Sequence, residues 1–449
     1  MNKSLMFCAM ILFWTGSDCT SAASVNKIVY PTLVESRELR GKKVVRINEE
    51  LTLNLQRSDF LGKELTTTYL EDGEWRHHVV NTAIFGLHED PEHLSSVLLH
   101  ELKNGVQLRG LLTPSHYIEP LYIMERADGG PMAHRVYKIR GVDYLQTGSS
   151  EMKISITERS LPQTVWMELT VVCDYDHQKA LENVEAHEEY VVLFMRSVTL
   201  RFYGFGPRIR FRLVELHLAS DEHSKDMLQC KEPCYGFANA VPEPVDGEAA
   251  LEKLKELLTK GVIANNPKVD LVYMITMRPN IVECSDDPNR GSYIVPGIAY
   301  EEGVCTDDNV ALGWDDAKFF LGVDVAVRLL AQLLGAPWDS DTKECNPNAG
   351  HMMGYYTKIT PNSYSFSECS KKGIIGTLRD RLQEDLDFKK KNPLRDSEES
   401  DERGCFGRPY DFDIDILDRN KLPGETVDMT EFCRAVMPVE EKQRIYKCE

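Results

Sequence analysis

The chain has 449 residues and a formal net charge of -19 at pH 7. A chain of this length is long enough for two or three domains, each with its own core. Hydrophobic residues make up 42% and charged residues 27% of the sequence, an ordinary balance for folded proteins that argues against wholesale disorder. The acidic excess argues against a general binder of nucleic acid or of anionic membranes.

The N-terminus has the pattern of a secretory signal peptide over residues 1–23. Lys3 gives it a basic start, Leu5–Trp14 form an apolar run, and residues 21–23 are the small residues of a cleavage site. The apolar run is too short to span a bilayer, and no later stretch approaches that length. We therefore expect secretion into the extracellular fluid without a membrane anchor.

Residues 24–160 lack cysteine and are typical of a strand-rich domain, with short alternating runs such as Ile28–Leu33 and Lys43–Leu55. The remaining chain holds ten cysteines. An even number in an oxidising compartment favours five disulfides, and the change in cysteine content predicts a domain boundary near residue 160. A zinc ribbon at Cys230 and Cys234 is disfavoured, because no second ligand pair follows at a suitable spacing.

After residue 160 the sequence predicts strands that alternate with helices, and hence an α/β layer structure. Gln178–Val191 and Glu248–Leu258 are expected helices, and Leu271–Met277 is a short β-rich run. Ala317–Leu334 has its apolar residues on one helical stripe and ends at a glycine, as helices often do. Longer apolar runs lie at Val165–Val172, Val191–Phe202 and Ile209–Leu216. The acidic tract from residue 396 reads as a solvated linker.

Residues 328–339 have the outline of a zinc-protease active site, H-E-x-x-H-x-x-G-x-x-H-D, of which only Gly335 and Asp339 are present. In that motif two histidines four residues apart share an ion on one helical face. The glutamate activates the metal-bound water, and the glycine turns the chain toward a third histidine. The two helical ligand positions, the base position and the third ligand position are here occupied by Arg328, Gln332, Leu329 and Trp338.

None of these four residues suits the chemistry. Arg328 is permanently charged and has no lone pair for a metal, and Leu329 accepts no proton. Gln332 is at best a weak oxygen donor, and Trp338 offers only an indole N–H. We therefore expect no catalytic residue and no metal ligand here. Taken alone, the segment also fits an ordinary amphipathic helix that ends in glycine.

A zinc site built from other histidines is also disfavoured. His351 is the only histidine after position 223, so ligands around this helix would have to come from distant segments. Three upstream His-Glu pairs, which begin at His88, His100 and His187, lack a second histidine at the required spacing. We expect these three side chains to be exposed or to lie on edge strands.

Several motifs in order around the helix resemble the reprolysin (adamalysin) family of metzincins, most closely the salivary metalloproteases of ticks. The segment Cys345–Met353 resembles the Met-turn of this family, with Met353 as its floor methionine. The other similar segments are Val165–Asp174, Asp270–Thr276, Gly297–Tyr300, Gly303–Cys305, Gly322–Val323, Leu333–Ala336 and Asn362–Ser370.

The resemblance implies a metzincin-type mixed sheet with an active-site helix and a Met-turn in residues 161–395. It implies a β-rich propeptide-like domain in residues 24–160, and an acidic linker with a truncated cysteine-rich region in residues 396–449. The front segment departs from the family, because it has neither a zinc-capping cysteine nor a furin-like basic site before Val165.

The resemblance also implies disulfides Cys345–Cys369 and Cys305–Cys405. Cys433 and Cys448 are then left for the tail. The remaining four cysteines can form disulfides among themselves in three ways; they are Cys173, Cys230, Cys234 and Cys284.

These observations predict a secreted, catalytically inactive metalloprotease homologue without a cofactor, which works by binding an extracellular protein or peptide. Host haemostatic or matrix proteins, or the substrates and inhibitors of active relatives, are the expected partners. One alternative is an active zinc metalloendopeptidase with a non-standard metal site. Another is that the front domain has the function and the rest is vestigial.

Overall fold

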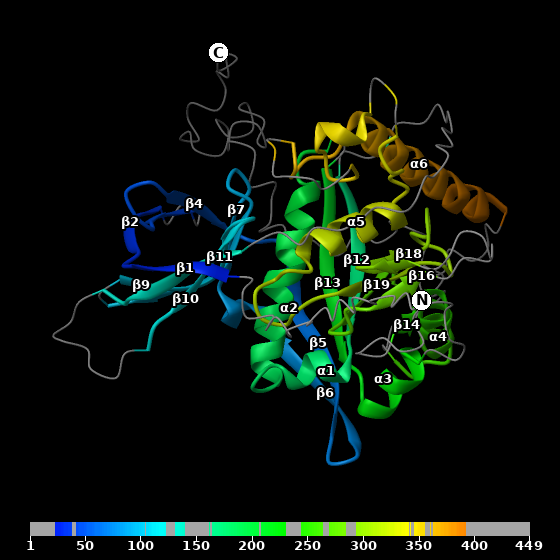
Figure 1. Cartoon of the computed structure of the whole chain (residues 1–449), viewed down its shortest axis with the longest axis horizontal. Coiled ribbons are helices and arrows are strands. Elements are labelled where there is room, and N and C mark those ends of the chain that lie inside the picture. Colours follow the sequence, from blue (N-terminus) through cyan, green and yellow to red (C-terminus); the bar gives the residue numbers. More distant parts are fainter. Residues whose placement is uncertain are drawn as a thin grey trace, which may run out of the picture.

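The structure of the protein is a computed structural model, shown in Figure 1. It describes residues 23–391 except 38–41, 104, 123–130, 140–160, 162–163, 206–207, 230–243, 264–268, 284–292, 341, 343–344, 355–359 and 361. The predicted signal peptide lies outside this part of the chain except for its last residue, and the predicted linker and tail (396–449) lie entirely outside it. No helix in the described part has both the length and the apolar character needed to cross a bilayer.

The front segment forms a nine-stranded sheet in which every neighbouring pair is antiparallel, in the order β1-β11-β10-β9-β8-β7-β4-β3-β2. The sheet encloses a small apolar core of its own, which includes Val45, Leu53 and Leu108. Its strands are β1 (Ala23–Val29), β2 (Thr32–Arg37), β3 (Lys42–Arg46), β4 (Thr52–Arg57), β7 (Leu87–Asp90), β8 (Ser95–Leu102), β9 (Gly105–Thr113), β10 (His116–Pro120) and β11 (His134–Ile139).

A second sheet has seven strands in the order β18-β19-β15-β12-β13-β5-β6. The five inner strands pair in parallel, and the two edge strands β18 and β6 pair antiparallel. This confirms the mixed sheet expected from the sequence. Its strands are β5 (Leu61–Glu71), β6 (Glu74–Asn81), β12 (Thr164–Cys173), β13 (Arg208–Leu218), β15 (Leu271–Thr276), β18 (Gly297–Ala299) and β19 (Val310–Trp314).

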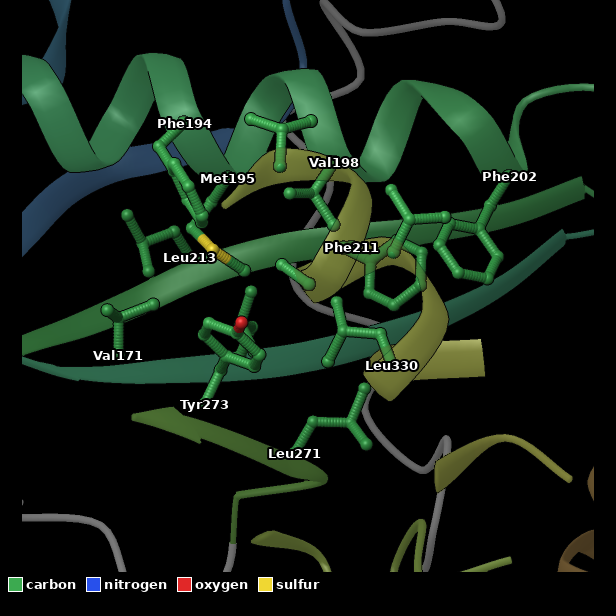
Figure 2. Packing of buried hydrophobic residues seen from close by; sticks show 14 of the residues in the cluster. Val171, Phe194, Met195, Val198, Phe202, Phe211, Leu213, Leu271, Tyr273 and Leu330 are labelled. Carbon is green, nitrogen blue, oxygen red and sulfur yellow. The ribbon is translucent and has the colours of Figure 1, made fainter. Parts of the chain in front are cut away.

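Helices cover both faces of the seven-stranded sheet, as parallel strands require. Helices α2 (Val184–Thr199) and α5 (Val323–Leu333) pack on one face, where Figure 2 shows Phe194, Val198 and Leu330 against residues of β12 and β13. Helix α4 (Gly247–Thr259) packs on the other face. The other α-helices are α1 (Tyr175–Lys179), α3 (Asp221–Met227) and α6 (Glu368–Lys391), and a small sheet contains β14 (Val245–Asp246), β16 (Ile281–Glu283) and β17 (Tyr293–Val295). Three 3-10 helices complete the described elements, η3 (Thr82–Phe85), η4 (Leu200–Phe202) and η5 (Pro347–Ala349).

Two helices differ from the sequence-based prediction. A helix is expected at 178–191, but α1 ends at Lys179 and α2 starts only at Val184. Helix α2 and the 3-10 helix η4 (Leu200–Phe202) together cover the apolar run Val191–Phe202. All side chains of this run are buried, so the run has no exposed polar face and its sequence does not show the period of an amphipathic helix. The predictions for α4 and β15 are confirmed.

The second difference concerns α5, which begins at Val323 instead of Ala317. Ala317 and Phe320 have positive φ values of 53° and 60°, which a helix does not allow. Two aspartates fix this irregular entry. Asp315 accepts hydrogen bonds from the N–H groups of Ala317 and Gly322, and Asp316 accepts one from the N–H of Phe319.

The hairpin β5–β6 comes from the predicted propeptide-like segment but belongs to the seven-stranded sheet. Strand β5 pairs in parallel with β13, with Leu61 opposite Leu213. Front-segment residues such as Phe60 and Leu65 lie in the same apolar core as α2 and α5. The front segment therefore has one apolar core of its own and also contributes residues to the core of the seven-stranded sheet. The boundary near residue 160 stays a prediction.

A buried ion pair joins α2 to the front sheet. The Arg196 Nε atom lies 2.7 Å from Glu89 Oε2, and both side chains are 2% exposed. Helix α2 also packs closely on the backbone of β9 in the front sheet. A Cβ atom on Gly110 of β9, where φ is +137°, would lie 2.8 Å from Leu193 Cδ2 and 2.3 Å from Ser96 O.

We predict that Arg196→Met lowers the free energy of unfolding by about 3–5 kcal/mol, because it leaves the Glu89 carboxylate buried without its cation. The matched control is Arg109→Met, which removes a half-exposed pair with Glu189 across the same interface and should cost less than about 1 kcal/mol. Urea unfolding measures both, and equal losses in the two variants would contradict the prediction.

Candidate functional site

Helix α5 holds the degenerate zinc-protease positions against the sheet. Arg328, Leu329 and Gln332 are all buried. The Leu329 side chain packs on glycine backbone, since a Cβ atom on Gly297 of β18 would lie 2.5 Å from its Cδ1 atom and one on Gly313 of β19 would lie 3.1 Å away. The base position of the motif therefore forms an apolar contact with two strands.

The Arg328 guanidinium is directed to the segment after the helix. Its Nε donates to the backbone oxygen of Met352 over 2.9 Å. Met353, the expected Met-turn residue, is fully buried, and its backbone oxygen accepts a hydrogen bond from the N–H of Asp339. The structure thus brings α5, the chain after Gly335 and the segment 351–354 together.

The turn after α5 depends on Gly335. Its φ is +89°, and a Cβ atom there would lie only 1.9 Å from Thr377 Oγ1. Beyond the turn, Trp338 is partly exposed and packs against the main core, and the buried Asp339 carboxylate accepts a hydrogen bond from Ser367. Burial raises the pKa of Asp339 above its ordinary value, although the Ser367 hydrogen bond opposes this effect.

Among the described residues, one group of three His, Cys, Asp or Glu side chains is close enough to hold a metal ion, and it lies away from these positions. Its members are Cys173, His177 and His187. The expectation that His187 is exposed or on an edge strand is wrong, because it lies fully buried in α2. The search for two histidines beside a glutamate missed this group, whereas the spacing Cys-x3-His-x9-His after a buried strand could have identified it.

His88 and His100 have different environments. His88 is buried on β7, which lies between β4 and β8, so the expectation for it is also wrong. The buried imidazole keeps a hydrogen-bond partner, because its Nδ1–H donates to the backbone oxygen of Gly86 over 2.7 Å. His100 is exposed on β8, as expected.

The cysteines partly follow the expected pattern. Cys345 and Cys369 form a disulfide with their Cα atoms 5.9 Å apart. Cys305 is also disulfide-bonded, and Cys405 lies outside the described residues, so this pairing stays a prediction. The expectation that Cys173 belongs to a disulfide is wrong, because its thiol is free and buried beneath α1 and α2.

Comparisons with known proteins give no family. No protein-family model and no curated protein sequence matches the chain. Among solved structures, metalloproteinase-II from Bacteroides fragilis matches with a TM-score of 0.35 and 12% identity over 80% of this chain and 93% of that chain. A chaperone-substrate complex matches with a TM-score of 0.30 and 10% identity over 48% of this chain and 35% of that one. Neither similarity is strong enough to carry an argument about fold or function.

We predict that Gly335→Ala lowers the free energy of unfolding by about 2–3 kcal/mol, from the overlap with Thr377 and the positive φ. Adding Thr377→Ala removes the closest overlap, although the Cβ atom of residue 377 stays 2.8 Å away. The double variant should therefore recover part of the loss and keep at least about 1 kcal/mol from the backbone conformation. Urea unfolding of the single and double variants measures both quantities. A double variant no more stable than Gly335→Ala would contradict this explanation.

Proposed function

We propose that this protein is a secreted metalloprotease homologue without catalytic activity, which acts by binding an extracellular protein or peptide. One observation carries the proposal. The residues at the ligand and base positions of α5 are engaged in other contacts, Arg328 with Met352 and Leu329 with two strands. A guanidinium placed where relatives would hold a dication repels a metal, and leucine cannot activate water.

The edge of the seven-stranded sheet next to α5 supplies a binding mode. Among the described residues, the part-buried strand β18 contacts α5 and pairs within the sheet with β19 alone. An extended peptide can add to such an edge through backbone hydrogen bonds, which need no metal. By the resemblance to tick salivary proteins, host haemostatic or matrix proteins are the partners we propose, and fibrinogen and gelatin are suitable probes.

The first test is hydrolysis. We expect purified protein to leave fibrinogen and gelatin intact, with and without added zinc, because no group at α5 activates water. Chelator-sensitive cleavage that Gln332→Ala abolishes, and that the control Gln107→Ala on β9 leaves unchanged, would establish the alternative of an active endopeptidase. Bound zinc without hydrolysis is compatible with the proposed inactivity, so cleavage is the result that contradicts it.

The second test locates the bound peptide. We expect fibrinogen or gelatin fragments to slow amide hydrogen exchange at residues 297–299, because an added strand would protect the free edge of β18. Strands β8 and β9 of the front sheet serve as internal controls and should keep their exchange rates. Protection confined to the front sheet would instead support a function of that segment.

A further inference from the structure

The group of Cys173, His177 and His187 lies at the carboxyl ends of the inner strands of the seven-stranded sheet. Strands β12, β15 and β19 run parallel, so these ends lie on the same side of the sheet. Cys173 is the last residue of β12, His177 is in α1, and His187 is in the first turns of α2. One ligand atom from each residue lies within 4.8 Å of the other two, and all three side chains are 0% exposed.

The spacing of the two imidazoles suits a shared ion. His177 Nδ1 lies 3.2 Å from His187 Nε2. Two nitrogens bound to one tetrahedral zinc ion at about 2.0–2.1 Å lie about 3.3–3.4 Å apart. A hydrogen bond between the rings also fits this distance. Metal content, measured below, distinguishes the two arrangements.

A carboxylate stands behind the cluster. Asp315, which directly follows β19, has its Oδ2 atom 3.4 Å from His177 Nε2. The same oxygen accepts a 2.6 Å hydrogen bond from the Tyr190 hydroxyl, and the other accepts from the Gly322 N–H. A carboxylate in this position holds the imidazole proton on the nitrogen that faces it, and the other nitrogen is then free to bind a metal. In His177, Nε2 faces Asp315 and Nδ1 faces His187.

We propose that Cys173, His177 and His187 bind one zinc ion, which fixes α1 and α2 to the carboxyl end of the sheet. Thiolate and imidazole are the ligands that zinc prefers in structural sites, and these three side chains would fill three of its four tetrahedral positions. On binding, the Cys173 thiol loses its proton to solvent and its sulfur becomes a zinc ligand, so one proton leaves as the ion enters. Because all three ligands are buried, the ion enters as α1 and α2 fold.

The test measures metal content and cobalt spectra of the full chain. We expect about one zinc per folded chain after expression with added zinc, and a thiolate-to-cobalt charge-transfer band after refolding with Co²⁺. Cys173→Ser should lose the band, and His187→Gln should lose most of the bound metal. The matched control is His351→Gln, which changes the histidine near α5 and should keep both the metal and the band. Zinc should also raise the Tm of the wild-type chain and not that of Cys173→Ser.

A folded wild-type chain that refolds in Co²⁺ without the band, and holds no zinc, would overturn the inference. This result needs no variant, so it decides even where Cys173→Ser fails to fold. The inference would also be overturned if Cys173→Ser kept the metal while His351→Gln or Gln332→Ala lost it, because that result would place the ion at α5. The proposed function fails separately, through chelator-sensitive hydrolysis, whichever site holds metal.

Discussion

Helix α2 is the element on which the rest of the structure depends, because it is buried between the two sheets and contacts α5. Its Arg196 reaches the front sheet through Glu89, and the other side of the helix lies in the core of the seven-stranded sheet. The same helix positions Tyr190 and His187 at the buried cluster. The front segment, the degenerate helix α5 and the cluster are therefore supported by one helix.

Local patterns in the sequence predicted the elements whose structure is set locally. The strand β12, the amphipathic helix α4 and the glycine turn after α5 follow from periodicity and from the conformational freedom of Gly335. The sequence did not reveal that Val191–Phe202 is a helix, because burial on all sides removes the period that marks one. The transfer of β5–β6 to the second sheet depends on pairing with a strand about 150 residues later, which no local pattern records.

The two candidate sites show why the same search found one and missed the other. At α5 the spacing of a zinc-protease motif survives, but the side chains that occupy it are a cation, an aliphatic group, an amide and an indole. At the cluster the ligand types are present, but they come from a strand end and two helices, and the fold alone brings them together. Motif spacing identifies a scaffold, whereas ligand chemistry needs three dimensions.

The hairpin β5–β6 has a consequence for how this chain responds to proteolysis. A break anywhere in residues 140–160 interrupts none of the strand pairings of the described residues, and it leaves Phe60 and Leu65 inside the larger core. The N-terminal piece would stay attached as two strands of a sheet formed mainly by the C-terminal piece. Nicking would then create a two-chain molecule of unchanged size, and dissociation would require unfolding of the sheet edge itself.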